Sequence, residues 1–407
     1  MKNSRNLRIA IVGGGIGGLT LALALRQRGI EATVYEQASE LSEIGAAVAL
    51  SANATRELRR LGVLDLIAGC STEPSELIYR DWRKGHRIAA FPVHDDLAYQ
   101  KRFGAPYFGI HRADLQRILS GALAGAGLQL GHRLTELSEH DQIMSLSFAN
   151  GRIAEADLVI GADGVRSLVR RYVIGGEETI YSGTSAFRGI VPAKQLPSLP
   201  DPQAIQFWMG PGAHLLHYAI GERAQDVNFF AVVEGPKTWS HEGWQAPVEP
   251  STALAPFKGW HPAVTEMVAA VEHRVRWALF TVRPLRQWWR GRAVLLGDAA
   301  HAMGPHHGQG ANTTIEDAIT LAEMLTSTRR DEIEAMMSRY QRLRRSRTRI
   351  IQLSSRATND LLHLPDESSA LADRDRRVSR FPDDFGWIHA FDALTTVRDA
   401  SSSEFAA

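Results

Sequence analysis

Residues 7–28 read LRIAIVGGGIGGLTLALALRQR, and this stretch decides the fold. The apolar run over residues 7–12 has the length and composition of a buried strand, and glycines follow it directly. The next run is rich in Leu and Ala, which favours a helix, and Gly29 supplies a stop signal. A second apolar run over residues 32–36 reads as another strand. The order strand, tight turn, helix, strand predicts a βαβ unit with a parallel sheet.

The glycines of the turn have G-x-G-x-x-G spacing at Gly13, Gly15 and Gly18. In a Rossmann-type unit the first glycine permits the turn, the second lets the backbone approach a pyrophosphate, and the third lets helix and strand pack closely. The helix N-terminus offers free N–H groups and a dipole that favour phosphate. Glu36 ends the next strand, where its carboxylate can accept hydrogen bonds from ribose hydroxyls and disfavours a 2′-phosphate. The pattern predicts tightly held FAD or NAD rather than NADP.

Composition and charge narrow the class of protein further. The chain has 407 residues, of which 44% are hydrophobic and 22% charged, as in ordinary globular proteins. Its 46 basic and 45 acidic side chains nearly balance, which removes the electrostatic reason to expect a nucleic acid or an acidic membrane as partner. Cys70 is the one cysteine, so no intrachain disulfide forms and no Cys/His metal cluster is expected. We expect a cytoplasmic protein, because no signal peptide or membrane span is evident. We expect no metal, because the residues form no recognisable cluster of metal ligands.

Two later apolar runs belong with the first unit, and a different pattern separates them. Residues 157–164 and 293–298 each read as a buried strand that ends in a turn with Gly and Asp. Between them, aromatic residues are common and short alternating runs indicate an antiparallel sheet. The fold class is therefore α/β, a Rossmann-type domain for FAD or NAD with an inserted, mainly antiparallel substrate domain. The first part of the nucleotide-binding domain is expected over 1–179, with an excursion into the substrate domain around 75–108. The insertion is expected over 180–285, the return of the first domain over 286–360, and a C-terminal linker and docked tail over 361–407. The resemblance described below implies that the first domain is an FAD-binding domain.

The C-terminal part gives more local signals. Thr313 and Glu316 have the spacing of a capping box, which predicts a helix that begins near Thr313. We interpret the arginines of residues 339–349 as a solvated helix face. Residues 366–380 are charged and poor in large apolar side chains, which predicts a loose linker, and residues 401–407 are expected to fray.

With these segments in order, the chain resembles the single-component FAD-dependent aromatic hydroxylases, the group that contains para-hydroxybenzoate hydroxylase and salicylate hydroxylase. The resemblance covers roughly residues 7 to 350. Within the family, the pattern is most similar to the salicylate hydroxylase-like and the 6-hydroxynicotinate monooxygenase-like members, and the salicylate hydroxylase-like members are preferred. Four segments carry it: the glycine turn with Glu36, GIHRADL at 109–115, DLVIGADGVRS at 157–167, and RAVLLGDAAHAMGPHHGQGANTTIEDA at 292–318.

The third and fourth of these segments supply candidate cofactor ligands. Asp298 ends a strand beside a glycine, where its carboxylate can accept hydrogen bonds from the ribityl hydroxyls of FAD. The loop with Gly308, Gly310, Ala311 and Asn312 precedes a helix, so its N–H groups can face the flavin and the helix dipole can stabilise the anionic reduced flavin. The resemblance further implies cofactor contacts by Arg112 and Asp163, and backbone contacts by Ala47 and Leu134.

The resemblance also implies an activity. Reduced nicotinamide nucleotide would reduce FAD, and a flavin C4a-hydroperoxide formed from O₂ would hydroxylate an electron-rich aromatic acid or phenol. The chain holds one Rossmann fingerprint, so NADH or NADPH would bind transiently, and the sequence leaves the choice between them open. A salicylate-like acid is the preferred substrate, with or without decarboxylation. A hydroxylated pyridine such as 6-hydroxynicotinate is the alternative, although residues 45–49 lack the histidine expected for it.

Two other classes of protein stay open at this point. One is an FAD or NAD oxidoreductase that does not activate O₂, and the other is a flavin-binding protein without turnover. The oligomeric state, monomer or homodimer, is also open.

Candidate residues on the substrate side come from the inserted domain and from the flavin loop. In a strand over residues 214–220, His214 and Tyr218 share one face and His217 lies on the other. His214 and Tyr218 could accept or share a phenolic proton, and His217 could contact the substrate. The alternative is that these are packed polar residues of a sheet face.

Three residues outside this strand complete the set. His306 is a candidate for proton transfer because it stands beside the flavin loop, and Pro305 is expected to contact the substrate. Arg188 could pair with a substrate carboxylate, and its alternative is an interdomain surface. His307 is interpreted as loop surface.

Overall fold

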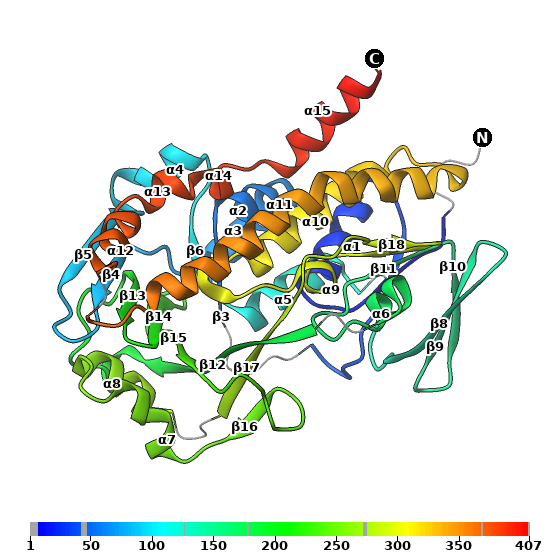
Figure 1. The fold of residues 1–407 in the computed structure, drawn as a ribbon. Helices are drawn as coiled ribbons and strands as arrows, with labels where there is room; N and C mark the ends of the chain where they lie inside the picture. The colour runs from blue at the N-terminus through cyan, green and yellow to red at the C-terminus, as the bar shows by residue number, and fades with distance from the viewer. Residues whose placement is uncertain are drawn as a thin grey trace.

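Two large β-sheets, each with its own helices, organise the chain in the computed structural model (Figure 1). The structure describes residues 7–41, 47–125, 127–176, 179–271, 275–367 and 369–405. The first sheet has six strands in the order β18-β19-β11-β1-β2-β7. Its strands are β1 (Ile9–Val12), β2 (Ala32–Tyr35), β7 (Leu128–Gln129), β11 (Leu158–Gly161), β18 (Trp289–Arg290) and β19 (Ala293–Leu295).

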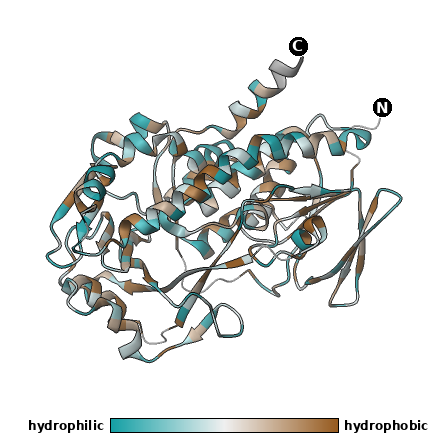
Figure 2. Cartoon of the chain, viewed as in Figure 1, coloured by the Kyte–Doolittle hydropathy of each residue, from teal (hydrophilic) through white to brown (hydrophobic). Residues whose placement is uncertain are grey.

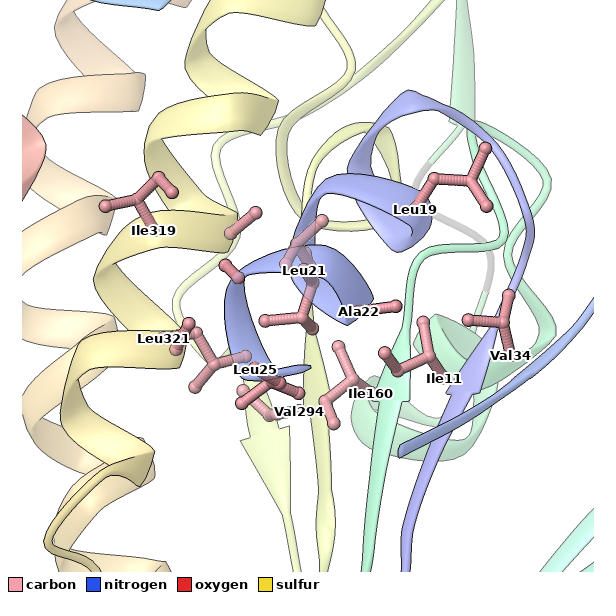
Figure 3. Close-up of a cluster of buried hydrophobic side chains, with 14 of the residues drawn as sticks. Ile11, Leu19, Leu21, Ala22, Leu25, Val34, Ile160, Val294, Ile319 and Leu321 are labelled. Atoms are coloured by element: carbon pink, nitrogen blue, oxygen red, sulfur yellow. The ribbon is translucent and has the colours of Figure 1, made fainter. Parts of the chain in front are cut away.

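The core of this first unit surrounds helix α1 (Ile16–Gln27), which follows β1 directly. The strand β1 pairs in parallel with β2 on one side and β11 on the other, as a doubly wound sheet requires. Figure 3 shows Leu21 and Leu25 of α1 between Ile160 and Val294 of the sheet and the helix α10 (Gly310–Leu325). Because α1 is covered on both sides, its residues 16–25 are all buried. Each fully buried leucine of this kind stabilises the fold by roughly 1.5–3 kcal/mol.

The second sheet has eight strands in the order β16-β17-β12-β15-β14-β13-β4-β5, and its middle strands run antiparallel. Residues 76–92 supply β4 and β5, so a segment early in the chain joins strands from the inserted region. The helices α7 (Pro250–Leu254) and α8 (Pro262–Ala269) cover one face, where Trp208 and Leu215 pack against Met267. The strands are β4 (Glu76–Asp81), β5 (Arg87–Pro92), β12 (Thr179–Pro192), β13 (Ile205–Gly210), β14 (Ala213–Ile220), β15 (Asp226–Glu234), β16 (Gln245–Pro247) and β17 (Val275–Val282).

Smaller elements connect and cover the two sheets. A three-stranded sheet of β8 (Leu134–His140), β9 (Ile143–Phe148) and β10 (Ile153–Ala156) stands at the edge of the molecule (Figure 1). The strands β3 (Ala47–Leu50) and β6 (Phe108–His111) pair between the large sheets. The remaining helices are α2 (Ala52–Arg60), α3 (Leu64–Ala68), α4 (Ala98–Phe103), α5 (Arg112–Ala122), α6 (Leu168–Ile174), α9 (Asp298–His301), α11 (Ile333–Leu362), α12 (Leu371–Val378), α13 (Phe381–Asp384), α14 (Gly386–His389) and α15 (Ala393–Phe405), with the 3₁₀ turns η2 (Asp95–Leu97), η3 (Ala193–Gln195), η4 (Ala255–Phe257), η5 (Pro305–His307) and η6 (Arg330–Glu332).

Hydropathy follows this arrangement. Figure 2 shows hydrophobic residues along the central strands and mixed surfaces on the long helices, as expected for helices with one buried face.

The expectation that the arginines of residues 339–349 all lie on a solvated face is wrong for two of them. Arg344 is 1% exposed and Arg347 is 9% exposed, because both pair with acidic side chains of α10.

Three further local expectations need correction. Helix α10 begins at Gly310 with Gln309 as N-cap, so Thr313 and Glu316 lie inside the helix and form no capping box. Glu316 instead binds Asn53 and the buried arginines, which is a use of its carboxylate that local spacing cannot show. Residues 371–378 form α12 rather than a loose linker, and α15 extends to residue 405.

Candidate active site

A cleft of about 330 Å³ lies between the glycine-rich loops of the first unit and one face of the eight-stranded sheet. Ten of the residues predicted for the site line it directly: Gly15, Ala47, Arg112, Arg188, Tyr218, Asp298, Pro305, Gly308, Gly310 and Ala311. They come from the start, the middle and the last third of the chain, so folding alone brings them together.

The glycines at the start of α1 serve two different purposes. A Cβ at Gly13 would clash with the carbonyl group of Ala162, and one at Gly18 would clash with the carbonyl oxygen of Gly13, so the fold itself requires both glycines. A Cβ at Gly15 would meet no atom within 4 Å, and Gly15 lines the cleft. Since the protein leaves this space free, the bare backbone at Gly15 fits close approach by a ligand. A pyrophosphate at the N-terminus of α1 is the group that this geometry accepts.

The Glu36 carboxylate is oriented beside this turn. Its Oε2 accepts a hydrogen bond of 2.6 Å from the Gly14 N–H, and its Oε1 accepts one of 2.8 Å from the Ala38 N–H. A carboxylate has further acceptor positions after two such bonds, so it can still accept hydrogen bonds from a ribose. Glu36 does not itself line the cleft, and its contact with a ribose stays a prediction.

Asp298 and the N-terminus of α10 form a further part of the cleft lining. Asp298 is exposed at the first position of α9 and lines the cleft. Gly310 is the first residue of α10 and lines the cleft as well, and a Cβ added there would meet no atom within 4 Å. The free N–H groups and the dipole of this 16-residue helix therefore face a space that suits a group with partial negative charge.

Asn312 does not line the cleft. It holds in place the loop that contains Gly308 and leads into α10. Its Nδ2 donates hydrogen bonds to the carbonyl oxygens of Ala49, at 2.9 Å, and Gly308, at 2.7 Å. Its Oδ1 accepts from the Ser51 N–H at 2.9 Å. These three bonds fix the loop against β3, whose residues Ala47 and Ala49 form the facing wall of the cleft. Asn312 is therefore a positioning residue in this structure.

Asp163 and Leu134, two predicted cofactor contacts, also lie outside the lining. The Asp163 carboxylate accepts hydrogen bonds from Ser167 Oγ at 2.5 Å and from the Leu168 N–H at 2.7 Å, so it caps the N-terminus of α6. Its neighbours Ala162 and Gly164 line the cleft, which makes Asp163 a support for that turn. Leu134 begins β8 and packs against the core of the first unit.

The substrate side of the cleft is a patch of the eight-stranded sheet. The register places Arg188, Phe230 and Leu216 opposite one another across β12, β15 and β14, and it places Asn228 opposite Tyr218 in the next row. All five side chains line the cleft. The guanidinium carbon of Arg188 lies 3.6 Å from the centre of the Trp277 ring, a cation–π contact that holds the positive charge at this wall. An apolar slot with one cation and two polar groups suits an aromatic acid.

His217 lies on the other face of the same sheet, as the period of two requires. It is fully buried near Trp208 and Arg80, and burial lowers its pKa to about 3. The structure therefore does not bring His217 to the cleft, and the expected substrate contact is absent from the geometry.

His214 and His306 lie behind the lining. Nδ1 of His214 is 2.7 Å from Nε2 of His363, and the rings of His214 and His306 meet edge to face at 5.2 Å. His306 packs against Gly304, a lining residue, since a Cβ at Gly304 would lie 2.8 Å from His306 Cδ2. Burial lowers the pKa of His214 well below its ordinary value and that of His306 to about 3, so both rings are neutral at pH 7.

His307 is buried and not loop surface, which corrects the expectation from the sequence. Its Nε2 lies 2.9 Å from Ser354 Oγ of α11. Sequence reasoning missed His363, Asn228 and Phe230. Phe230 and Asn228 could have been found from the alternation of the strand 227–233, but His363 lies 149 residues from His214 and carries no local signal.

A buried group of charged side chains around Asp317 holds the turn that carries Asp298. Oδ2 of Asp317 accepts hydrogen bonds from the Gly297 N–H at 3.0 Å and from His301 Nε2 at 2.6 Å, and Oδ1 accepts from Arg344 Nε at 2.6 Å. Burial alone raises the pKa of Asp317, but the charges of His301 and Arg344 outweigh it and lower the pKa below its ordinary value. Arg344 also binds Glu316 at 2.6 Å. The α10–α11 contact thereby fixes the backbone that carries Asp298.

Sites of two other kinds find no support in the described residues. Within these parts of the chain, no three His, Cys, Asp or Glu side chains gather as metal ligands would. None of the described helices combines the length and apolar character that crossing a bilayer needs.

The chain belongs to the FAD binding domain family, whose sequence profile matches residues 6–353. With the cleft described above, this makes the protein a flavoprotein monooxygenase of the aromatic hydroxylase class, with FAD as its cofactor. The residues fit that cofactor, since Gly15 and the N-terminus of α10 both leave bare backbone in the lining of one cleft.

Individual relatives place the chain within this class. It is 38% identical over 387 residues to a 3-amino-4-hydroxybenzoate 2-monooxygenase of Streptomyces platensis. The aligned region covers 95% of this chain and 96% of the relative. It is 34% identical over 346 residues to a 6-hydroxynicotinate 3-monooxygenase of Bordetella bronchiseptica, covering 85% of this chain and 89% of the relative. The solved structure of a salicylate hydroxylase–substrate complex is 27% identical with a TM-score of 0.82 and covers 97% of this chain and 98% of that chain.

These findings confirm the predicted fold class, the cofactor and the class of enzyme. The two other classes that the sequence left open, a flavoprotein that does not activate O₂ and one without turnover, are set aside by them. The substrate, the nicotinamide nucleotide and the role of each residue are not decided by the comparisons.

Proposed function

We propose that the protein hydroxylates the ring of a phenolic carboxylic acid, with O₂ and either NADH or NADPH as co-substrates. The observation that carries this proposal is the pair of Arg188 and Tyr218 on one wall of the cleft. They stand on β12 and β14, two strand spacings or about 10 Å apart, with β15 between them. This leaves a slot for one aromatic ring with its carboxylate toward Arg188 and its hydroxyl toward Tyr218.

Each part of the cleft has a distinct task in this proposal. When bound, FAD supplies the redox chemistry, taking electrons from the nicotinamide nucleotide and passing one oxygen atom of O₂ to the ring. Gly15, Asp298 and the N-terminus of α10 hold the cofactor. Arg188 binds the substrate carboxylate, a charge-assisted contact that fixes which ring carbon faces the cofactor. Phe230 and Leu216 keep water away from the reacting ring.

Three substrates fit this description to different degrees. The 3-amino-4-hydroxybenzoate of the relatives at 37–39% identity has both groups on one ring, and so does the salicylate preferred from the sequence. The alternative 6-hydroxynicotinate also has a carboxylate and a ring hydroxyl, and two relatives at 33–34% identity take it. The segment whose missing histidine argued against this pyridine falls partly outside the described residues. We place the aminohydroxybenzoate first because its carboxylate and hydroxyl stand at opposite ends of the ring, which suits two partners that are two strands apart on one wall.

The test is a substrate panel with FAD-loaded protein. NADH and NADPH oxidation and O₂ uptake are followed with the three acids, and product masses are recorded. The proposal predicts that one phenolic acid stimulates both rates and gains one oxygen atom. A simultaneous loss of the carboxyl group would identify decarboxylative hydroxylation. If none of the acids stimulates O₂ uptake, the proposed substrate class is wrong.

Replacing Arg188 with Met should weaken binding of the carboxylated substrate selectively. Methionine keeps an unbranched apolar stem but removes the charge, so about 2–3 kcal/mol of charge-assisted binding is lost and KM rises roughly 30- to 150-fold. Turnover at saturation should fall less. The control is the matching phenol without a carboxylate, whose KM should not change in the variant. A similar rise for both compounds would mean that Arg188 acts on the shape of the cleft and not on the carboxylate.

A further inference from the structure

A second pocket, of about 230 Å³, lies where the C-terminal helices α13 and α14 pack beside α4 and the strands β4 and β5 (Figure 1). None of the described residues lines both this pocket and the cleft. Its walls are mostly apolar or aromatic and include Leu77, Phe91, Phe103 and Phe381. An apolar cavity of about 150 Å³ already accommodates a benzene ring, so this pocket has room for one ring with a substituent.

His389 offers an N–H group to this pocket. The Tyr99 hydroxyl accepts a hydrogen bond of 3.0 Å from the Ala52 N–H, and its oxygen lies 2.5 Å from Nδ1 of His389. Burial raises the pKa of Tyr99 well above its ordinary value, so the hydroxyl keeps its proton and donates it to Nδ1. Burial also lowers the pKa of His389 to about 3, so its ring is neutral at pH 7. The one imidazole proton therefore sits on Nε2.

Two buried polar atoms of the lining lack a partner. In the part of the chain that the structure describes, neither Nε2 of His389 nor the hydroxyl of Tyr107 makes a hydrogen bond. Both residues line the pocket, and they are only 6% and 8% exposed. Their rings lie nearly parallel, with centres 6.5 Å apart. Because buried polar groups are nearly always hydrogen-bonded, two such groups in one apolar pocket point to a ligand that carries an oxygen atom.

The charges around the pocket favour an uncharged ligand. Among its described lining residues Arg102 alone has a formal charge at pH 7. Its guanidinium pairs with the Asp383 carboxylate at 2.7 Å and donates to the carbonyl oxygen of Pro382 at 2.9 Å, and its side chain is half exposed. The cation is therefore already neutralised at the rim, which distinguishes this pocket from the cleft, where Arg188 suits a carboxylate.

The strands β3 and β6 support both spaces. The Ala52 N–H that binds Tyr99 begins α2, directly after β3, whose residues 47–49 line the cleft. Tyr107 directly precedes β6, and Gly109 of β6 packs on the ring of Tyr218, since a Cβ at Gly109 would lie 2.8 Å from Cδ2 of Tyr218. The pocket is thus a separate site whose wall is joined to the wall of the cleft.

We propose that this pocket is a second binding site, for a small uncharged aromatic compound with a hydroxyl or carbonyl oxygen. The ring packs among the apolar walls, and its oxygen accepts a hydrogen bond from the Nε2–H of His389. The Tyr107 hydroxyl makes the second hydrogen bond to the same oxygen. Binding at this site does not depend on which acid the cleft takes, so the inference goes beyond the proposed function.

Titration calorimetry of FAD-loaded protein with phenol and with toluene tests the site. The two compounds have the same number of heavy atoms, and only phenol has an oxygen. Phenol should bind more tightly than toluene to the wild-type protein. Tyr107→Phe removes one hydroxyl and keeps the ring, so phenol should bind roughly 2- to 10-fold more weakly while the Kd of toluene stays the same. Ala98→Phe places a ring in the pocket and should abolish binding of both compounds there.

The matched control is Tyr172→Phe, which removes a tyrosine hydroxyl that binds Glu139 outside the pocket and should leave both Kd values unchanged. Crystals soaked with 4-bromophenol locate the ligand, because bromine scatters anomalously. A bromine position beside His389 and Tyr107 is expected. Bromine in the cleft alone would overturn the site, and so would equal affinities for phenol and toluene. An unchanged affinity for phenol in Tyr107→Phe would do the same, and this variant decides the question even if Ala98→Phe fails to fold.

Discussion

Replacing Gly15 with Asp should abolish FAD binding and leave the fold intact. Gly15 is the N-cap of α1 and has extended backbone angles that any residue adopts, so an aspartate is a favourable cap there. Its side chain would enter the free space beside the cleft, where the structure has no atom within 4 Å. That space would then hold a carboxylate against the two negative charges of a pyrophosphate. We expect the Kd for FAD to rise by at least about a hundredfold, or roughly 3 kcal/mol.

Two matched variants separate the reasons for this effect. Gly15→Asn has the same size without the charge and should weaken FAD binding less than Gly15→Asp. Gly18→Ala should instead destabilise the apoprotein, because its Cβ would clash with the Gly13 carbonyl. FAD titration by fluorescence and thermal unfolding of the apoproteins measure the two properties. If Gly15→Asp binds FAD normally, the pyrophosphate does not lie at the start of α1.

Replacing Arg344 with Met should cost about 3 kcal/mol of unfolding free energy or more. The guanidinium is 1% exposed and contacts Glu316 and Asp317, whose side chains are fully buried. Methionine fills the space but leaves two buried carboxylates with less positive charge nearby. Urea unfolding of the apoprotein, followed by circular dichroism, measures the loss. FAD affinity should fall too, because Asp317 holds the Gly297–Asp298 turn.

The control for this variant is Arg349→Met, which changes an exposed arginine of the same helix and should alter stability by no more than about 0.5 kcal/mol. The pH dependence gives a second check. The pKa of Asp317 and that of Glu316 are lowered in the folded protein, so their contribution is present above the ordinary carboxyl pKa of about 4 and is lost as the pH falls through the folded values. The difference in unfolding free energy between wild type and Arg344→Met should therefore shrink below about pH 4. A constant difference would mean that packing, not charge, explains the loss.

The elements that the sequence predicted well are those with local signals. The glycine turn gives β1, α1 and β2 because its G-x-G-x-x-G spacing between two apolar runs is a pattern within one short stretch of the chain. The alternation of residues 227–233 gives β15, and the same period places His214 and His217 on opposite faces. The cofactor end of the cleft follows from these patterns, because a Rossmann unit fixes its own ligand position.

The remainder depends on partners that lie far away in the chain. Glu316 and Arg344 looked like a cap and a surface charge, yet they pair with each other in the core. His363 lies in a stretch without any recognisable motif and contacts His214 only because α11 ends beside the β13–β14 turn. Asp163 matched a cofactor motif, but its carboxylate caps α6. Spacing along the chain cannot reveal such contacts, because buried polar groups find their partners in space.

The most direct test of the central claim uses oxygen labelled with its heavy isotope. FAD-loaded protein, reduced nicotinamide nucleotide and 3-amino-4-hydroxybenzoate react under labelled O₂, and the product is analysed by mass spectrometry. We predict a ring-hydroxylated acid that carries one labelled oxygen atom, with the other atom in water. A product whose new oxygen comes from water, or nucleotide oxidation that yields only hydrogen peroxide with every phenolic acid, would contradict the account.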